Sequence, residues 1–330
     1  MRDFLRAYPA EAKLLVVLAL LCALLSLASP QFLTLVNLTS LLNNNAVNLI
    51  WAVGLLVVLI AGGIDISFAV GASVVQYLAV MALMGMGGGG WAVGIALAMA
   101  LGIGLGLINA ALIHGFRIIS IVVKISTFNA FFGLLMFFTS GKSIYSLPDW
   151  LSRPIYLWEL QTEIGWADIR LPVVVMAICL FATWFLIRRT TTGRQLYAFG
   201  DNPEGARRAG INIWLMQAIA FGWCGMMAGI AGLMQAHITK EVVPNALIGR
   251  ELDVLAAVVL GGARLGGGRG SVLGCVLGVA LVAVAQNGLN LLGVSPYAFK
   301  MVVGIIILAA ISTSNIDLAA MLAPKRRDRE

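Results

Sequence analysis

The sequence predicts an all-α, polytopic membrane protein with about ten transmembrane helices and one short cytoplasmic helix. Its composition is 60% hydrophobic and only 11% charged, whereas soluble domains are about a quarter charged. The apolar residues also gather in segments of the length that crosses a bilayer as a helix. When these segments are counted, the strongest basic clusters fall on one side, as the positive-inside rule requires. Residues 1–330 are therefore interpreted as a single transmembrane domain.

The first apolar segment runs from Leu14 to Ala28 and follows a basic N-terminus. A basic start before an apolar run is also typical of a cleaved signal peptide. Against cleavage, Asp3 and Glu11 dilute the positive charge, and Pro30 follows the small residues at the end of the segment. We therefore expect a retained first span with its N-terminus in the cytoplasm.

Further apolar segments continue along the chain and are interpreted as the remaining spans: 44–61, 66–85, 91–113, 118–139, 171–187, 213–235, 251–263, 270–292 and 298–313. Residues 251–263 are few for a span, so we expect this segment to be broken or tilted. Counting from a cytoplasmic N-terminus places residues 188–212 and the basic C-terminal tail inside. Both termini are thus predicted to be cytoplasmic, and residues 141–170 are predicted to form a loop on the outer side.

The outer loop, residues 141–170, combines four carboxylates with Trp150, Trp158 and Trp166. Tryptophan is enriched where a membrane meets water, because its ring is amphipathic. One interpretation of this loop is therefore an interfacial anchor. The other is a surface that meets an extracytoplasmic protein.

Residues 188–212 are a long polar run between two strongly apolar segments, and their second half predicts a short surface helix. Asn202 can cap it, Pro203 suits the first helical position, and Gly210 can adopt the left-handed conformation that ends it. The charged side chains follow the helix dipole, acidic first and basic last: Glu204, Arg207 and Arg208. A basic loop that only fixes orientation needs none of these caps, so the pattern favours a docking helix.

Short motifs along the chain carry a family resemblance. In the polar run they are Thr192-Gly193-Arg194, Tyr197-Ala198-Phe199-Gly200, Asn202-Pro203, Ala206-Arg207 and Gly210-Ile211-Asn212. Elsewhere they are Gly62-Gly63-Ile64-Asp65-Ile66-Ser67, Glu251-Leu252-Asp253, Ala256-Ala257-Val258-Val259-Leu260-Gly261-Gly262 and Gly266-Gly267-Gly268-Arg269-Gly270-Ser271. Together they resemble the permease subunits of sugar-importing ABC transporters of the ribose, galactose and autoinducer type. Only the first residues and about 141–170 fall outside the resemblance.

The resemblance implies the membrane-spanning subunit of an ATP-driven importer that moves a small hydrophilic solute, a monosaccharide or sugar derivative, by alternating access. The implied partners are a cytoplasmic ATP-binding subunit, a second copy of this permease or a related one, a periplasmic solute-binding protein, and the lipid of a bacterial inner membrane. Residues 188–212 would dock on the ATP-binding subunit. The residues expected to carry this coupling are Thr192, Gly193, Arg194, Asn202, Pro203, Glu204, Arg207, Arg208 and Gly210.

Polar residues at the ends of two spans are candidates for the translocation path or a gate. Asp65 and Ser67 follow a glycine pair, where they are either a capped turn or part of a broken helix that lines the path. Lys124 lies about two turns inside a span, where the resembled family commonly has a threonine-leucine-glycine-threonine run after a proline. Its long side chain either snorkels to the interface or faces the interior. The nearby polar residues favour the interior: Ser126, Thr127 and Asn129.

No catalytic motif accompanies these features. Residues 266–271 lack the lysine and the spacing of a Walker phosphate loop, and the two histidines, His114 and His237, do not have the spacing of a zinc protease. We therefore expect no enzyme activity, cofactor, metal site or nucleic-acid partner, and we assign ATP hydrolysis to a partner subunit. The alternative is a secondary transporter or channel independent of ATP, which would need a chain of ionisable groups within its helices.

Overall fold

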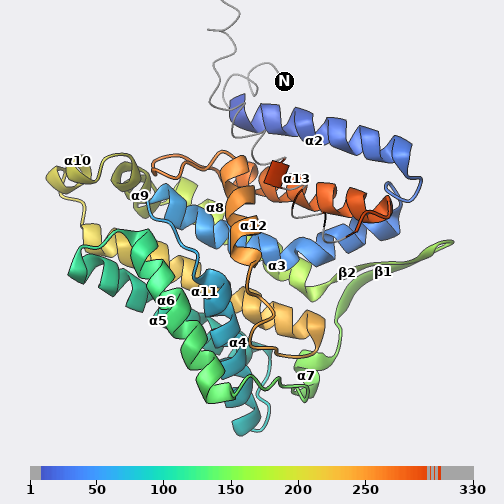
Figure 1. The fold of residues 1–330 in the computed structure, drawn as a ribbon, viewed down its shortest axis with the longest axis horizontal. Coiled ribbons are helices and arrows are strands. Elements are labelled where there is room, and N and C mark those ends of the chain that lie inside the picture. Colours follow the sequence, from blue (N-terminus) through green and yellow to red (C-terminus); the bar gives the residue numbers. More distant parts are fainter. Residues whose placement is uncertain (1–8, 296–297, 299–300, 302–303, 306–330) are drawn as a thin grey trace, which may run out of the picture.

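The computed structural model describes residues 9–295, 298, 301, 304 and 305, and it is predominantly helical. Among these residues, eight helices are long and apolar enough to cross a membrane (Figure 1). They are α2 (Pro9–Ala28), α3 (Leu35–Ile60), α4 (Phe68–Gly85), α5 (Trp91–Phe116), α6 (Ser120–Thr139), α8 (Leu171–Arg189), α11 (Ile213–Thr239) and α13 (Val272–Leu291). Length and composition alone thus support a multi-pass membrane protein.

The shorter elements lie in the connections between these helices. They are α7 (Asp149–Ser152), β1 (Tyr156–Thr162), β2 (Gly165–Arg170), α9 (Thr191–Asp201), α10 (Pro203–Arg208) and α12 (Arg250–Leu260). Helix α12 stands where the short span was expected. Its 11 residues reach about 17 Å, too short for a hydrocarbon core of about 30 Å. The expected last span, 298–313, falls almost wholly outside the described residues, so the count of ten spans stays a prediction.

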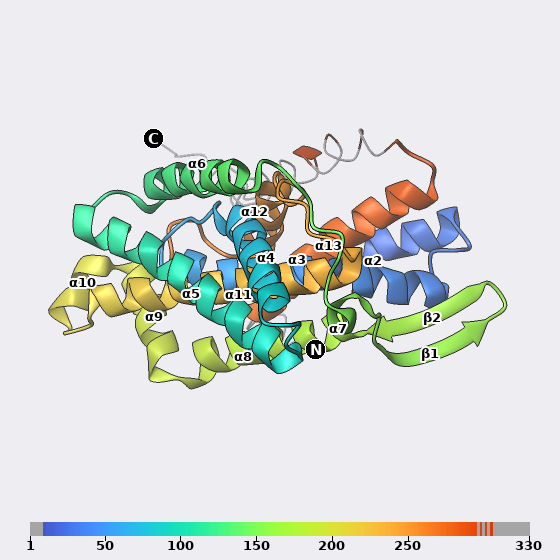
Figure 2. The ribbon, with the colours of Figure 1, turned by 90° about the horizontal axis from the view of Figure 1, so that it is seen from below.

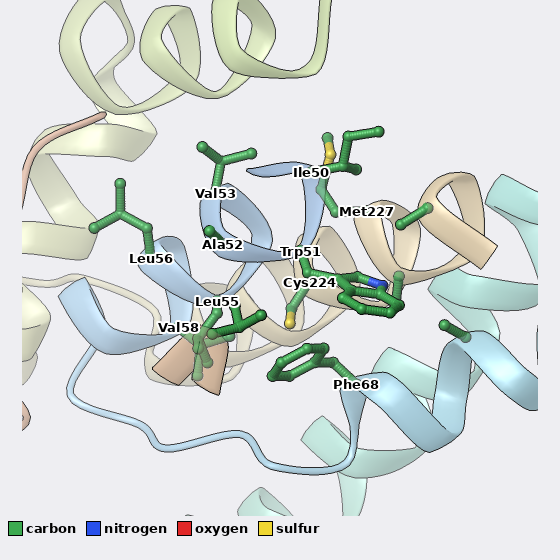
Figure 3. Close-up of a cluster of buried hydrophobic side chains, with 14 of the residues drawn as sticks. Ile50, Trp51, Ala52, Val53, Leu55, Leu56, Val58, Phe68, Cys224 and Met227 are labelled. Carbon is green, nitrogen blue, oxygen red and sulfur yellow. The ribbon is translucent and has the colours of Figure 1, made fainter. Parts of the chain in front are cut away.

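Helix α3 is the centre of the molecule, between α13 on one side and α11 on the other (Figure 1). From Ala46 to Ile60 every residue except Asn48 is buried. A helix that is apolar all round must be enclosed by other elements, and here α4, α8, α11, α12 and α13 enclose it. Figure 3 shows part of this core, where Trp51 of α3 lies 5.9 Å from Phe68 of α4, near Cys224 and Met227 of α11.

Helices α5 and α11 approach each other closely because glycines face each other across their interface. A Cβ atom at Gly102 would overlap the carbonyl group of Gly225, and a Cβ atom at Gly225 would overlap that of Gly102. One turn further on, Gly106 packs in the same way against the backbone of Phe221. Lipid provides little hydrophobic drive for helix association, so such close van der Waals packing is the main source of stability in this interface.

The hairpin of β1 and β2 and the helix pair α9–α10 lie at opposite ends of the bundle (Figure 2). At one end, Asn43 Nδ2 donates to the carbonyl of Asp168 in β2 at 2.9 Å. At the other end, the carbonyl of Ile60 accepts from the Gly268 N–H at 2.9 Å, beside Gly200 of α9. Because α3 joins both contacts, the two ends are about 25 Å apart. Which end faces the cytoplasm stays a prediction.

The outer loop, residues 141–170, corrects the expectation of an all-α fold, because it contains an antiparallel two-stranded sheet. Residues 156–170 include β-favouring tyrosine, tryptophan and threonine, and Gly165 has a φ of +154° after the turn. Trp150 is half-buried: its Nε1 donates to the Gly88 carbonyl, and its ring packs edge-on against Trp91 at 4.9 Å between ring centres, whereas the anchor interpretation of the loop stays a prediction. Trp158 and Trp166 remain exposed on the hairpin.

Candidate functional site

The helix α10 forms as its sequence predicts. The Asn202 side chain accepts a hydrogen bond from the Gly205 N–H at 2.9 Å, and Pro203 occupies the first turn. Gly210 has a φ of +81°, which lets the chain turn away after the helix. Only Ala206 is buried, so the rest of α10 is presented to its surroundings. The Glu204–Arg208 ion pair is exposed at 3.7 Å, and such a pair contributes little to stability.

The preceding helix, α9, contains Thr192, Gly193 and Arg194 in its first turn. Thr190 caps it by accepting a hydrogen bond from the Gly193 N–H at 3.0 Å. A Cβ atom at Gly193 would overlap the last carbonyl groups of α8, so glycine permits the sharp corner between α8 and α9. The sequence analysis did not predict this helix, although its buried residues recur at helical spacing: Gly193, Leu196, Phe199 and Gly200.

The inner face of α9 is fixed to the bundle by Tyr197 and Gly200. The Tyr197 hydroxyl donates to the Gly270 carbonyl at 2.6 Å, and burial raises the pKa of Tyr197 while the Arg188 charge lowers it. The hydroxyl is therefore protonated, and able to donate, at neutral pH. Gly200 touches the backbone of Ile60 and of Gly268 so closely that a Cβ atom has no room. A force applied to α9 thus reaches the end of α3 and the loop between α12 and α13.

The outward side of the same two helices is strongly basic. Five exposed arginines lie on or next to it: Arg188, Arg189, Arg194, Arg207 and Arg208. Two exposed carboxylates accompany them, Asp201 and Glu204. This surface combines a net positive charge with a rigid attachment to the bundle, which suits a partner with an acidic docking surface.

A buried ion pair lies where the extended segment between α3 and α4 meets α6. Lys124 Nζ lies 2.6 Å from Asp65 Oδ2, and the two side chains are 1% and 4% exposed. Asp65 Oδ1 accepts hydrogen bonds from the backbone N–H and the hydroxyl of Ser67, at 2.8 and 2.9 Å. The ammonium also lies 4.5 Å from the centre of the Phe221 ring, where a cation is attracted to the aromatic face. Both charges are therefore paired and hydrogen-bonded, as burial requires.

The ion pair also attaches α6 to the rest of the protein. Only four residues of this helix are buried: Val123, Lys124, Thr127 and Leu135. The Ile64 N–H donates to the Ser120 hydroxyl at 3.1 Å, next to the ion pair. The Lys124 ammonium faces the interior rather than the membrane interface, so the snorkelling interpretation is wrong for this structure.

The structure brings Asp65, Ser67 and Lys124 together. Of the other two candidates, Thr127 lies close to them and Asn129 does not. Thr127 is buried one turn along α6 and bonds only to the Lys124 carbonyl, at 3.4 Å. Asn129 is exposed and donates to the Ile125 carbonyl of its own helix at 2.8 Å. The sequence analysis did not pair Lys124 with Asp65, although two opposite charges in apolar segments are a recognised signal for pairing.

The space beside the ion pair is small. A cavity of about 20 Å³ is lined by Asp65, Ser67, Lys124 and Phe221, and by Asn109 of α5. This volume holds one water molecule. The Asn109 Oδ1 atom is buried and has no hydrogen-bond partner among the described residues.

The fold and these sites define a multi-pass α-helical membrane protein with a rigid basic helix pair at one end and a buried ion pair beneath it. Within the residues that the structure describes, no three metal-ligating side chains are close enough to hold a metal ion. Residues 37–311 match the family described as branched-chain amino acid transport system / permease component, and the chain belongs to this family.

The curated relatives cover almost the whole chain. It is 33% identical over 320 residues to the ribose import permease protein RbsC of Escherichia coli K12, which spans 95% of this chain and 96% of the relative. It is 32% identical over 298 residues to the autoinducer 2 import system permease protein LsrC of Photorhabdus luminescens, with coverage of 89% and 87%. It is 32% identical over 329 residues to the probable ABC transporter permease protein YphD of Escherichia coli K12, with coverage of 99% and 96%. No solved structure matches the chain.

Proposed function

We propose that this chain is the membrane-spanning subunit of an ATP-driven importer for a monosaccharide or sugar derivative. The single observation that supports this most is the relatedness along almost the full chain to permeases named for ribose and autoinducer 2 import. The basic helix pair gives the permease a surface for an ATP-binding partner. We place the protein in a bacterial inner membrane, with both termini and α9–α10 on the cytoplasmic side, as the positive-inside rule favours.

In this proposal α10 docks on the ATP-binding subunit, and α9 transmits the movement. Exposed Arg207 and Arg208 supply the charge of the docking helix, while Asn202, Pro203 and Gly210 fix its two ends. The contacts of Tyr197 and Gly200 carry the motion to α3 and to the loop before α13. A second permease copy and a periplasmic solute-binding protein complete the transporter, the latter on the hairpin end.

The buried ion pair serves as a gate element in this mechanism. Lys124 and Asp65 connect α6 with the segment between α3 and α4, so relative motion of these helices must keep or break the pair. Ser67 supports the carboxylate and Thr127 lies alongside, whereas exposed Asn129 is not part of the gate. Because the two charges cancel each other, this site does not select for a charged solute.

Reversal of charge on α10 tests the coupling. Arg207→Glu with Arg208→Glu should leave membrane insertion and folding intact, because both side chains are exposed. Solute uptake should fall to background in cells that also contain the ATP-binding subunit, since the contact is electrostatic. The measurement is uptake of labelled solute at equal amounts of membrane-inserted protein.

The matched control is Lys142→Glu with Arg153→Glu, the same change of charge at the exposed hairpin end. Because this end is proposed to meet the solute-binding protein, the two variants are compared by co-purification of the ATP-binding subunit, which the control should retain and the α10 double variant should lose. Normal uptake by the well-inserted α10 double variant would rule out docking through this helix.

A further inference from the structure

A second cavity, larger than the one beside the ion pair, lies among α3, α12 and α13. Its volume is about 110 Å³, against about 20 Å³ beside Lys124. The larger space holds several water molecules, whereas the smaller holds one. The residues that line it are Asn45 and Asn48 of α3, Arg250, Asp253, Val254 and Ala257 of α12, and Val279, Val282 and Gln286 of α13.

The polar side chains of this cavity suit a solute with many hydroxyl groups. The amides of Asn45, Asn48 and Gln286 each provide donors and an acceptor, the Arg250 guanidinium donates, and the Asp253 carboxylate accepts. A hydroxyl group both donates and accepts, so this mixture serves several hydroxyls at once. One positive and one negative side chain leave the lining without net charge. The valines and Ala257 supply an apolar wall for the C–H face of a sugar ring.

Several of these groups are held in place before any solute arrives. Asn48 Nδ2 donates to Asn45 Oδ1 at 3.2 Å, and Asn45 Nδ2 donates to the Leu41 carbonyl at 2.9 Å. Arg250 Nη1 donates to Gln235 Oε1 of α11 at 3.2 Å, and its guanidinium lies 5.9 Å from the centre of the Trp51 ring. A pre-organised set of polar groups loses less conformational entropy when a ligand binds.

The cavity also lies at the depth where a transported solute must pass. Asn48 is halfway along α3, and α12 is a short helix followed by Gly261 and Gly262 rather than a full span. Polar groups and irregular backbone are tolerated at membrane depth where they line a cavity, and broken helices commonly build the solute sites of transporters.

We propose that this cavity is the solute-binding site, and that it recognises a neutral polyhydroxylated solute of monosaccharide size through Asn48, Gln286 and the Arg250–Asp253 side chains. The inference rests on the proposed importer function and makes it specific. It separates recognition from the Lys124–Asp65 pair, which acts as a gate element without contact to the solute.

The test uses the full complex in proteoliposomes, with the ATP-binding subunit and the solute-binding protein, and D-ribose as the probe. Gln286→Met and Asn48→Leu remove hydrogen bonding at nearly constant volume and should each reduce D-ribose uptake at least tenfold, while ATP hydrolysis persists. The controls Asn290→Leu and Asn44→Leu change exposed amides on the same two helices and should stay within twofold of the unchanged protein. Pocket variants that also stay within twofold would overturn the inference.

A second measurement is independent of the solute chosen. In a background with the four native cysteines replaced, Gln286→Cys should react with a water-soluble methanethiosulfonate reagent, whereas Ala283→Cys, buried on the same helix, should not. An unreactive Cys at position 286 would overturn the proposed site even if transport is confirmed. Conversely, the Cys at position 286 could react while the unchanged complex shows no ATP-driven uptake. That result would contradict the importer function but would still support a water-accessible cavity at this position.

Discussion

Substitution of Lys124 should destabilise the protein far more than joint removal of both charges. Lys124→Met leaves the Asp65 carboxylate buried at 4% exposure without its partner. Loss of one member of a buried ion pair costs about 3–5 kcal/mol. Asp65 keeps its two hydrogen bonds from Ser67, so we expect the lower end, about 3 kcal/mol. For a chain of 330 residues that corresponds to a fall in Tm of about 4 °C.

The double variant Lys124→Met with Asp65→Asn removes both charges, and the Asn side-chain oxygen can still accept from Ser67. Replacement of a whole buried pair is nearly neutral, so Tm should lie within about 2 °C of the unchanged protein. The two single variants and the double variant give a coupling free energy of about 2 kcal/mol or more. Thermal unfolding in detergent measures the Tm of the unchanged protein, the two single variants and the double variant. Lys142→Met serves as the control at an exposed lysine.

A coupling free energy below about 0.5 kcal/mol would refute this reasoning, because that is the range of an exposed ion pair. Lys124→Arg gives an independent check. A lysine at the interface tolerates arginine. Here the ammonium lies 2.6 Å from Asp65 Oδ2 and 4.5 Å from the centre of the Phe221 ring, and a planar guanidinium cannot reproduce both contacts of this compact charge. We therefore expect Lys124→Arg to lose both stability and uptake.

The remaining predictions concern α9 and the topology. Burial raises the pKa of Tyr197 above the ordinary tyrosine value of 10.0. The protonated hydroxyl therefore contributes its full stabilisation below pH 10.0, and this stabilisation is lost as the pH rises through the raised pKa of the folded protein. Tyr197→Phe should abolish this alkaline loss of stability in unfolding scans. At pH 7 it should cost about 1 kcal/mol, because the hydrogen bond is missing. An unchanged alkaline profile would contradict this role of the Tyr197 hydroxyl. Cysteines introduced near Trp158 should react with impermeant reagents from outside, and those near Glu204 only from within; the opposite pattern would overturn the assignment of sides.

The features that the sequence predicted well are those set by local chemistry. Helix α10 depends on Asn202, Pro203 and Gly210, whose preferences act within a few residues, and each occupies the expected position. The transmembrane helices are likewise visible in the sequence, because burial in lipid demands long apolar segments. The short segment at 251–263 was visible too, because it has too few residues to span a bilayer, and the structure has the 11-residue helix α12 there.

The features that the sequence did not reveal depend on contacts between distant segments. Lys124 and Asp65 are neighbours only because α6 packs against the start of α4, and hydrophobic periodicity does not say which helices touch. The contacts of Trp150 with Trp91 and Gly88 likewise join residues about 60 positions apart, which sequence patterns do not pair. The hairpin was missed because its strands are short and β1 is exposed along almost its whole length, so the regular alternation of apolar and polar residues is absent.

The importer function is tested most directly by the energy source of transport. The complete complex, reconstituted in proteoliposomes with the ATP-binding subunit and the solute-binding protein, should accumulate D-ribose only when ATP is present, and accumulation should stop when the ATP-binding subunit is left out. Uptake that proceeds at the same rate without ATP, or that follows an imposed proton or sodium gradient, would contradict the proposal and identify a secondary transporter instead.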